Sequence, residues 1–228
     1  LTSFNEAESF SFPPKAYSLR WYENFIGDPA WMRAFGNSVV VALLVTASAT
    51  AIGTLAAIGL YKSSFLGKNA LAGLMIGPLI IPGILIAIGL YSVFTRLNML
   101  GSLPGLVALP LVIINVLAAL STFDPKLEQA AESLGAGHWI TFRRILLPLI
   151  LPGVLAGAIF AFITSFDEII ISLFIQSPFL QTLPVKMFQS VTQDSDPTVA
   201  AVAVFMMLIS IGLASTTRFL KSRPGSKK

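Results

Sequence analysis

Long apolar blocks constrain this chain more than any other feature, because each is about as long as a helix that crosses a bilayer. Such a crossing takes about 20 helical residues. The blocks cover Phe35–Leu60, Ala70–Phe94, Leu103–Leu120, Ile145–Ile175 and Val199–Phe219. The alternating pattern of a membrane barrel is missing from the sequence. A helix satisfies its own backbone in lipid, so we expect an all-α, polytopic transmembrane helical bundle.

Composition agrees with a membrane protein. Only 11% of the 228 residues are charged, and the mean hydropathy is +0.80. Soluble domains usually carry about 25% charged residues. The lack of cysteine excludes disulfides, zinc–cysteine sites and thiol catalysis. The net charge of +4 does not indicate nucleic-acid binding, because the basic residues collect at the span ends instead of forming a basic domain.

Proline and glycine interrupt two of the spans. Pro78, Pro82 and Gly83 are expected to kink or locally unwind the second span. Pro104 and Pro110 shorten the third, which is only just long enough to cross. The fourth block is longer than needed, so its start is expected outside the membrane core.

Loop charge predicts the orientation, because cytoplasmic loops carry the excess of Lys and Arg. The richer side is assigned to the cytoplasm and holds Lys62, Lys68, Lys126, Arg143, Arg144, Arg218, Lys221, Arg223, Lys227 and Lys228. The other side holds Lys15, Arg20, Arg33, Arg96 and Lys186. Segment 1–34, the Arg96 loop and the Gln176–Pro197 loop then face outward, 35–220 forms the transmembrane domain, and the basic tail 221–228 is cytoplasmic. Five spans leave the two ends on opposite sides, so we expect a further span before the first one seen.

The most informative segment is the cytoplasmic loop 121–148. Asp124 and Pro125 form a helix start, with a capping side chain followed by a residue that needs no N–H. Gly135 and Gly137 break this helix before a second one ends near Pro148. The loop is therefore expected to form a helix–turn–helix outside the bilayer, with apolar anchors for a partner protein at Leu134, Trp139, Ile140 and Phe142.

The spacing in this loop resembles the Glu-Ala-Ala motif of ABC importer permeases. Gln129-Ala130-Ala131 is followed after three residues by Gly135, and nine residues later by Ile145 and then Leu147-Pro148. The departure is Gln129 at the acidic position, with Glu128 before it. The resemblance implies a coupling helix near Ser133–Trp139 that enters a groove of the ATPase. The ATPase-coupling residues are then Glu128, Gln129, Ala130, Ala131, Ser133, Leu134, Gly135, Ala136, Gly137, His138 and Trp139.

Three further segments resemble the spermidine/putrescine branch of that family: Ser18–Tyr22, Asn37-Ser38 and Ser165–Glu168. The resemblance covers nearly the whole chain. It implies the type I importer permease fold, with six spans of which five are visible. It also implies additional residues near Val107–Ala108.

Asp167 and Glu168 are acidic residues within the fourth apolar block. Ionisable groups in a membrane cost about 2.5–3.5 kcal/mol on insertion scales and usually face a cavity or partner. One interpretation places a carboxylate on the substrate path, where it attracts a cation; the other is a buried contact with a second permease. Adjacent helical residues diverge by about 100°, so both are not expected in one pore. Phe166 could pack around a ligand or only between helices, and Pro82 and Gly83 could line the path or only kink a span.

The sequence predicts a transport subunit that is not itself an enzyme. No Gly-x-x-x-x-Gly-Lys-Ser/Thr segment is present, so this chain is expected to bind no cofactor, with ATP and Mg in the partner ATPase. The single His138 lies in the coupling loop, which gives no support to a metal site. Asp194 and Asp196, beside Pro197, are expected to cap the last span rather than bind a ligand.

We therefore expect a permease subunit of an ATP-driven importer in the bacterial inner membrane. Its expected partners are an ATPase dimer, a second homologous permease and an extracytoplasmic binding protein that meets the outward segments. The expected substrate is a polyamine such as putrescine or spermidine, or a related amine. The alternatives are an importer of another small solute, such as an amino acid derivative or phosphonate, an ATP-independent secondary transporter, and an intramembrane hydrolase using Asp167. A secondary transporter would need an inverted repeat or an ion site, and the sequence shows neither. A hydrolase would need a second catalytic acid on another span, which is also missing from the sequence.

Overall fold

The computed structural model describes residues 2–6, 16–62, 65–76, 80–107, 143–144, 147–177, 179–194 and 196–221. The chain divides into two compact units. Unit 1 takes its described residues from Leu1–Leu44, Pro82–Leu109 and Ile163–Leu213. Unit 2 takes its described residues from the remaining segments.

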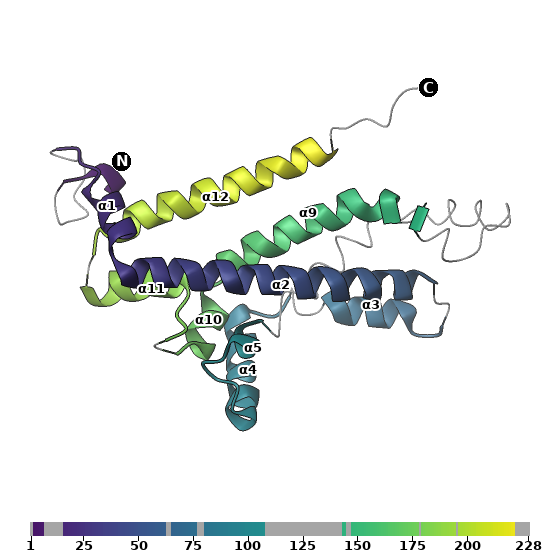
Figure 1. The fold of residues 1–228 in the computed structure, drawn as a ribbon. Coiled ribbons are helices and arrows are strands. Elements are labelled where there is room, and N and C mark those ends of the chain that lie inside the picture. Colours follow the sequence, from purple (N-terminus) through teal and green to yellow (C-terminus); the bar gives the residue numbers. More distant parts are fainter. Residues whose placement is uncertain are drawn as a thin grey trace, which may run out of the picture. The chain divides into compact units, whose positions relative to one another are not determined.

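Helices account for the regular structure of the described residues (Figure 1), which confirms the all-α prediction. A 3-10 turn η1 and a π-helical turn accompany them, and within these ranges the only β-type contacts are two isolated bridges, Asn5–Tyr17 and Ser177–Leu180. The elements in chain order are η1 Thr2–Phe4, α1 Arg20–Gly27, α2 Pro29–Lys62, α3 Lys68–Ile76, α4 Gly83–Leu97, α5 Leu103–Val107, α9 Leu147–Phe166, α10 Ile170–Ile175, α11 Leu183–Gln189, the π-helical turn Ser190–Asp194 and α12 Thr198–Lys221.

Among the described helices, α2 and α12 each contain a segment long and apolar enough to cross a membrane. These segments are Pro29–Leu60 and Thr198–Thr216, and shorter apolar helices cover Gly83–Arg96 and Ile150–Phe166. Large apolar side chains stay exposed along α2 and α12: Leu55 is 71% exposed and Leu208 is 64% exposed. Such a surface suits lipid or another subunit better than water.

The second and third predicted spans are only partly regular. The second is divided into α3 and α4, and Ile80, Ile81 and Pro82 between them are not helical, which confirms the predicted local unwinding. Of the third, only α5 lies among the described residues, and the coupling loop 121–142 lies outside them.

The fourth span, which the sequence predicts as one block from Ile145 to Ile175, is interrupted. Helix α9 ends at Phe166, and α10 begins at Ile170. The prediction of a continuous helix is wrong because acidic side chains at the junction favour a new helix start over continuation. The following segment Gln176–Pro197, expected as a loop, contains α11 and a π-helical turn.

An aromatic cluster forms the core of unit 1. The ring centroid of Phe25 lies 6.3 Å from that of Trp31 and 5.3 Å from that of Phe205. The Phe35 ring lies 5.6 Å from Phe205 and 6.3 Å from Phe166. Trp31 and Phe166 are each only 1% exposed. Each such ring pair stabilises a fold by about 0.5–1.5 kcal/mol beyond burial, so the cluster ties α1, α2, α9 and α12 together.

Asp-Pro pairs begin the two longest helices. The N–H of Ala30 donates to Oδ1 of Asp28 at 2.7 Å, and the N–H of Thr198 donates to Oδ1 of Asp196 at 2.9 Å. These bonds satisfy donors that have no partner within the helix. The expectation that Asp196 caps the last span is confirmed.

Side chains of Asn37 and Ser38 fix the start of α11 against α2. Nδ2 of Asn37 donates to the Gln181 carbonyl at 3.0 Å, and the Leu183 N–H donates to the Ser38 hydroxyl at 2.7 Å. Ser38 is buried, so its bond is protected from water. The segment that leads into α11, which the sequence predicts as a loop, is thus held against α2.

Gly101 joins α10 to the turn between α4 and α5. Helix α10 packs against both α4 and α5 (Figure 1), and the Gly101 N–H donates to the Ile175 carbonyl at 2.7 Å. Gly101 has φ +68°, and a Cβ there would lie 2.6 Å from Cβ of Ser177. The position therefore requires glycine for both conformation and space.

We predict that Gly101→Ala destabilises the protein by about 1–3 kcal/mol through overpacking and backbone strain. Thermal unfolding of the purified protein in detergent measures the effect. Gly89→Ala is the matched control, because a Cβ at Gly89 meets nothing within 4 Å. Equal melting temperatures for Gly101→Ala and the wild type would show that the close approach of Gly101 to Ser177 does not contribute to stability.

Candidate functional site

The structure gives Asp167 and Glu168 different surroundings. The carboxylate Oε1 of Glu168 accepts a hydrogen bond from the Ile171 N–H at 2.9 Å. Glu168 thereby satisfies a free donor in the first turn of α10. Asp167 follows the last residue of α9, and its own N–H donates to the Ile163 carbonyl at 3.0 Å. The Glu168 carboxylate therefore stabilises the start of α10, whereas the Asp167 carboxylate does not take part in it.

Asp167 lines a cavity of about 590 Å³ in unit 1, which we call the Asp167 cavity. It is the one charged side chain among the lining residues, which come from the α9–α10 junction, α11 with the turn that follows it, and α12. Most of the others are apolar, and three are methionines. The lining residues are Asp167, Ile169, Pro184, Met187, Phe188, Val191, Val199, Ala203, Met206, Met207, Ser210 and Ile211.

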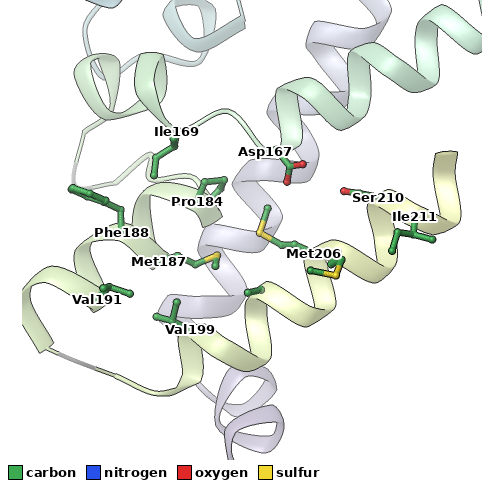
Figure 2. A pocket seen from close by; sticks show the side chains of 12 residues that line it. Asp167, Ile169, Pro184, Met187, Phe188, Val191, Val199, Met206, Ser210 and Ile211 are labelled. Carbon is green, nitrogen blue, oxygen red and sulfur yellow. The ribbon is translucent and has the colours of Figure 1, made fainter. Parts of the chain in front are cut away.

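Ser210 is the second polar group of this cavity. Figure 2 shows its hydroxyl on α12 pointing toward the Asp167 carboxylate on the opposite wall. The hydroxyl oxygen is buried and has no hydrogen-bond partner among the described residues. Such groups are uncommon in native proteins and call for an explanation. The cavity thus offers a carboxylate and a hydroxyl within an apolar wall, an arrangement that can hold an amphipathic cation.

The other predicted path residues lie elsewhere. Phe166 is buried in the aromatic cluster, with its ring beside Phe35. Pro82 precedes α4, and a Cβ at Gly83 would lie 3.7 Å from the Ile170 side chain, so the start of α4 lies beside α10. None of these residues lines the Asp167 cavity.

Sequence reasoning missed most of this lining. Ser210 carries a signal, because a hydroxyl within an apolar span is a candidate functional group. The three methionines carry none, since methionine also fills ordinary cores. Within the part of the chain that the structure describes, no group of His, Cys, Asp and Glu could hold a metal ion. The predicted coupling residues, Glu128 to Trp139, lie outside the described residues.

Comparison with known proteins gives consistent results. Residues 49–224 match the family described as "Binding-protein-dependent transport system inner membrane component". The chain is 31% identical over 224 residues to the spermidine/putrescine transport system permease protein PotC of Haemophilus influenzae, which covers 96% of this chain and 87% of that protein. It is 30% identical over 204 residues to the putrescine transport system permease protein PotI of Escherichia coli K12, covering 84% and 73% respectively.

A solved structure has the same fold. It is a chain from the crystal structure of a bacterial ABC transporter involved in the import of the acidic polysaccharide alginate, with a TM-score of 0.74. The match covers 94% of this chain and 87% of that one at 14% sequence identity. At that identity the likeness speaks for the fold alone.

We predict that Glu168→Ala destabilises α10 by about 1 kcal/mol, because a backbone donor loses its capping acceptor. Glu168→Gln is the conservative control, since its amide oxygen still accepts the hydrogen bond. Thermal unfolding of the purified protein compares the two. A loss in Glu168→Gln as large as in Glu168→Ala would contradict a capping role.

Proposed function

Because the chain belongs to the family of binding-protein-dependent transport system inner membrane components and is therefore a permease subunit of an ABC importer, we propose that it forms the path for a polyamine. As a subunit of this kind it is not itself an enzyme. Putrescine and spermidine are the favoured substrates.

The observation that carries this proposal is the composition of the Asp167 cavity. A polyamine alternates ammonium groups with short methylene chains. The Asp167 carboxylate suits an ammonium, and the methionine and aliphatic side chains suit the methylenes. Among the described residues that line the cavity, none is cationic, so none of them repels such a substrate. Its volume of about 590 Å³ is typical of small-molecule sites.

The named relatives support the same class of substrate. Both are described as permease proteins of transport systems for spermidine or putrescine. Their similarity to this chain extends over most of its length, including the segment that holds Asp167. The three regions that resemble this branch in sequence all have structural roles here: Trp21 and Tyr22 bond to the N-terminal segment, Asn37-Ser38 holds α11, and Glu168 starts α10.

The orientation belongs to the same proposal. The described parts of segment 1–34, the turn after Arg96 and segment Gln176–Pro197 all fall in unit 1. Loop charge places all three outside the membrane. Because these three segments belong to one compact unit, they support an outward face that meets a binding protein. The C-terminus then lies in the cytoplasm.

Residues Ser3 and Asn5 of the N-terminal segment are bonded to α1, which gives the proposed docking surface a defined conformation. The indole N–H of Trp21 donates to the Asn5 carbonyl at 2.7 Å, and the Tyr22 hydroxyl bonds to that of Ser3 at 3.0 Å. Nδ2 of Asn24 donates to the Thr198 hydroxyl at 2.8 Å, which fixes α1 to the start of α12. Tyr17 and Ile26 remain 70% and 68% exposed and are available for a partner.

Coupling to ATP is assigned to residues 121–148. The motif from Gln129 to Pro148 supports a contact with a separate ATPase subunit, which binds ATP and Mg. A second, homologous permease completes the path. In this arrangement the small residues near Gly135 let the loop approach the ATPase backbone closely.

We predict that Asp167→Asn lowers polyamine import by at least about tenfold, which corresponds to about 1.4 kcal/mol. Import of radiolabelled putrescine is measured in vesicles containing the permease pair, ATPase and binding protein. Asp167→Glu, which keeps a carboxylate at the same position, is the control and should retain import. Full putrescine import by Asp167→Asn would contradict a role of this carboxylate in the substrate path. A wild-type transporter that imports other solutes but no polyamine would contradict the proposed substrate class.

We predict that Gly135→Leu leaves the permease assembled in the membrane but reduces substrate-stimulated ATP hydrolysis by at least about tenfold, because a bulky side chain blocks close packing. Gly212→Leu on α12 is the control, since a Cβ there meets nothing within 4 Å. Hydrolysis by the complete complex is followed with and without putrescine. Normal stimulation in Gly135→Leu would separate the loop from coupling.

A further inference from the structure

A second cavity of unit 1 is lined by carboxamides. It has a volume of about 500 Å³, and we call it the amide pocket. Its lining residues are Leu173, Gln176, Ser177, Gln181 and Gln189. They come from α10, the connection to α11, and the end of α11 itself. None of the five is charged, so the pocket offers hydrogen bonds without a net charge.

The sides of the amide pocket are held in place by hydrogen bonds. The side-chain amide of Gln181 donates to that of Gln189. The backbone carbonyl of Gln181 accepts from Asn37 of α2 at 3.0 Å. The Ser177 hydroxyl donates to the Gly101 carbonyl and accepts from the Leu180 N–H, at 3.4 and 3.3 Å. The pocket is therefore fixed in shape before any ligand arrives.

Gln176 supplies an unused acceptor. Its side-chain oxygen Oε1 is buried and receives no hydrogen bond from any residue in the described ranges. A buried carbonyl without a donor is unfavourable, and a ligand with N–H groups would remove that cost. Gln176 lines the pocket, so a rotation of its side chain would turn this acceptor toward an ammonium bound there.

Helix α11 separates the amide pocket from the Asp167 cavity. Pro184, Met187 and Phe188 line the Asp167 cavity, and their spacing of three and four residues places them on one helix face. Gln189, on the same helix, lines the amide pocket. It is rotated by about 100° from Phe188. Two cavities of different chemistry thus share one short wall.

We propose that the amide pocket is a transit site for an ammonium group of the substrate, separate from the Asp167 cavity. The inference rests on the proposed polyamine transport. Carbonyl oxygens replace part of the hydration shell of an ammonium, as they do for other cations in transport proteins. With no carboxylate in the lining, the pocket binds weakly enough to release its ligand, which a transit site requires.

The test compares variants of Gln176 in the complete transporter, reconstituted in vesicles with saturating, putrescine-loaded binding protein. The measured quantity is putrescine imported per ATP hydrolysed. Gln176→Leu, which keeps the size but removes the acceptor, should lower this ratio by at least about threefold without changing ATP hydrolysis. Gln176→Asn, which keeps a neutral amide acceptor on a side chain one methylene shorter, should lose less of this ratio than Gln176→Leu. Ser92→Ala, at an exposed position of α4 that lines neither cavity, is the control and should leave the ratio unchanged.

The outcomes separate the two proposals. A Gln176→Leu transporter with the wild-type ratio would overturn the transit site and leave polyamine transport standing. Equal losses in Gln176→Leu and Gln176→Asn would also overturn it, because the side chain would then serve packing alone. A wild type that imports no polyamine overturns both proposals.

Discussion

The hydrogen bond between the Glu168 carboxylate and the Ile171 N–H determines how unit 1 is built. It starts a new helix in a sequence that is otherwise apolar enough to continue α9. Because the chain changes direction there, α10 packs against α4 and α5 and carries the chain on toward α11. The same break leaves Asp167 at the end of α9, where its side chain enters a cavity. The two adjacent carboxylates thus have different places, Glu168 at the start of α10 and Asp167 at the cavity.

Helix α2 provides the fixed support on which this arrangement is assembled. Trp31 and Phe35 join it to α1, α9 and α12 through ring contacts, while Asn37 and Ser38 hold the entry to α11. Apolar burial gives these contacts their strength, and the two hydrogen bonds give them direction. The ammonium of Lys186 lies 5.4 Å from the Trp31 ring centroid, so a cation of α11 is directed to α2 rather than into the Asp167 cavity. The ammonium of Lys186 is therefore not among the groups that line the cavity.

An importer must bind its substrate well enough to accept it and weakly enough to release it. Under our proposals, the Asp167 cavity and the amide pocket offer different means to that end. The Asp167 cavity combines one charge with an apolar wall, whereas the amide pocket has dipoles and no charge. Their common wall, α11, is a short helix held to α2 by polar contacts, so a change at this helix affects both cavities.

The sequence by itself determined the membrane class, the first and last spans, the break before Gly83, the cap at Asp196 and the family, because these depend on local patterns of apolar, proline, glycine and acidic residues. It also singled out the Asp167–Glu168 pair, since charge in an apolar block is conspicuous. Only the tertiary structure decided which of the two carboxylates caps a helix and which lines a cavity. It alone placed Ser210 opposite Asp167 and gathered Gln176, Gln181 and Gln189 in one pocket. The physical reason is that these placements depend on contacts between helices distant in sequence, such as α2 with α11 and α1 with α12, which no local pattern records.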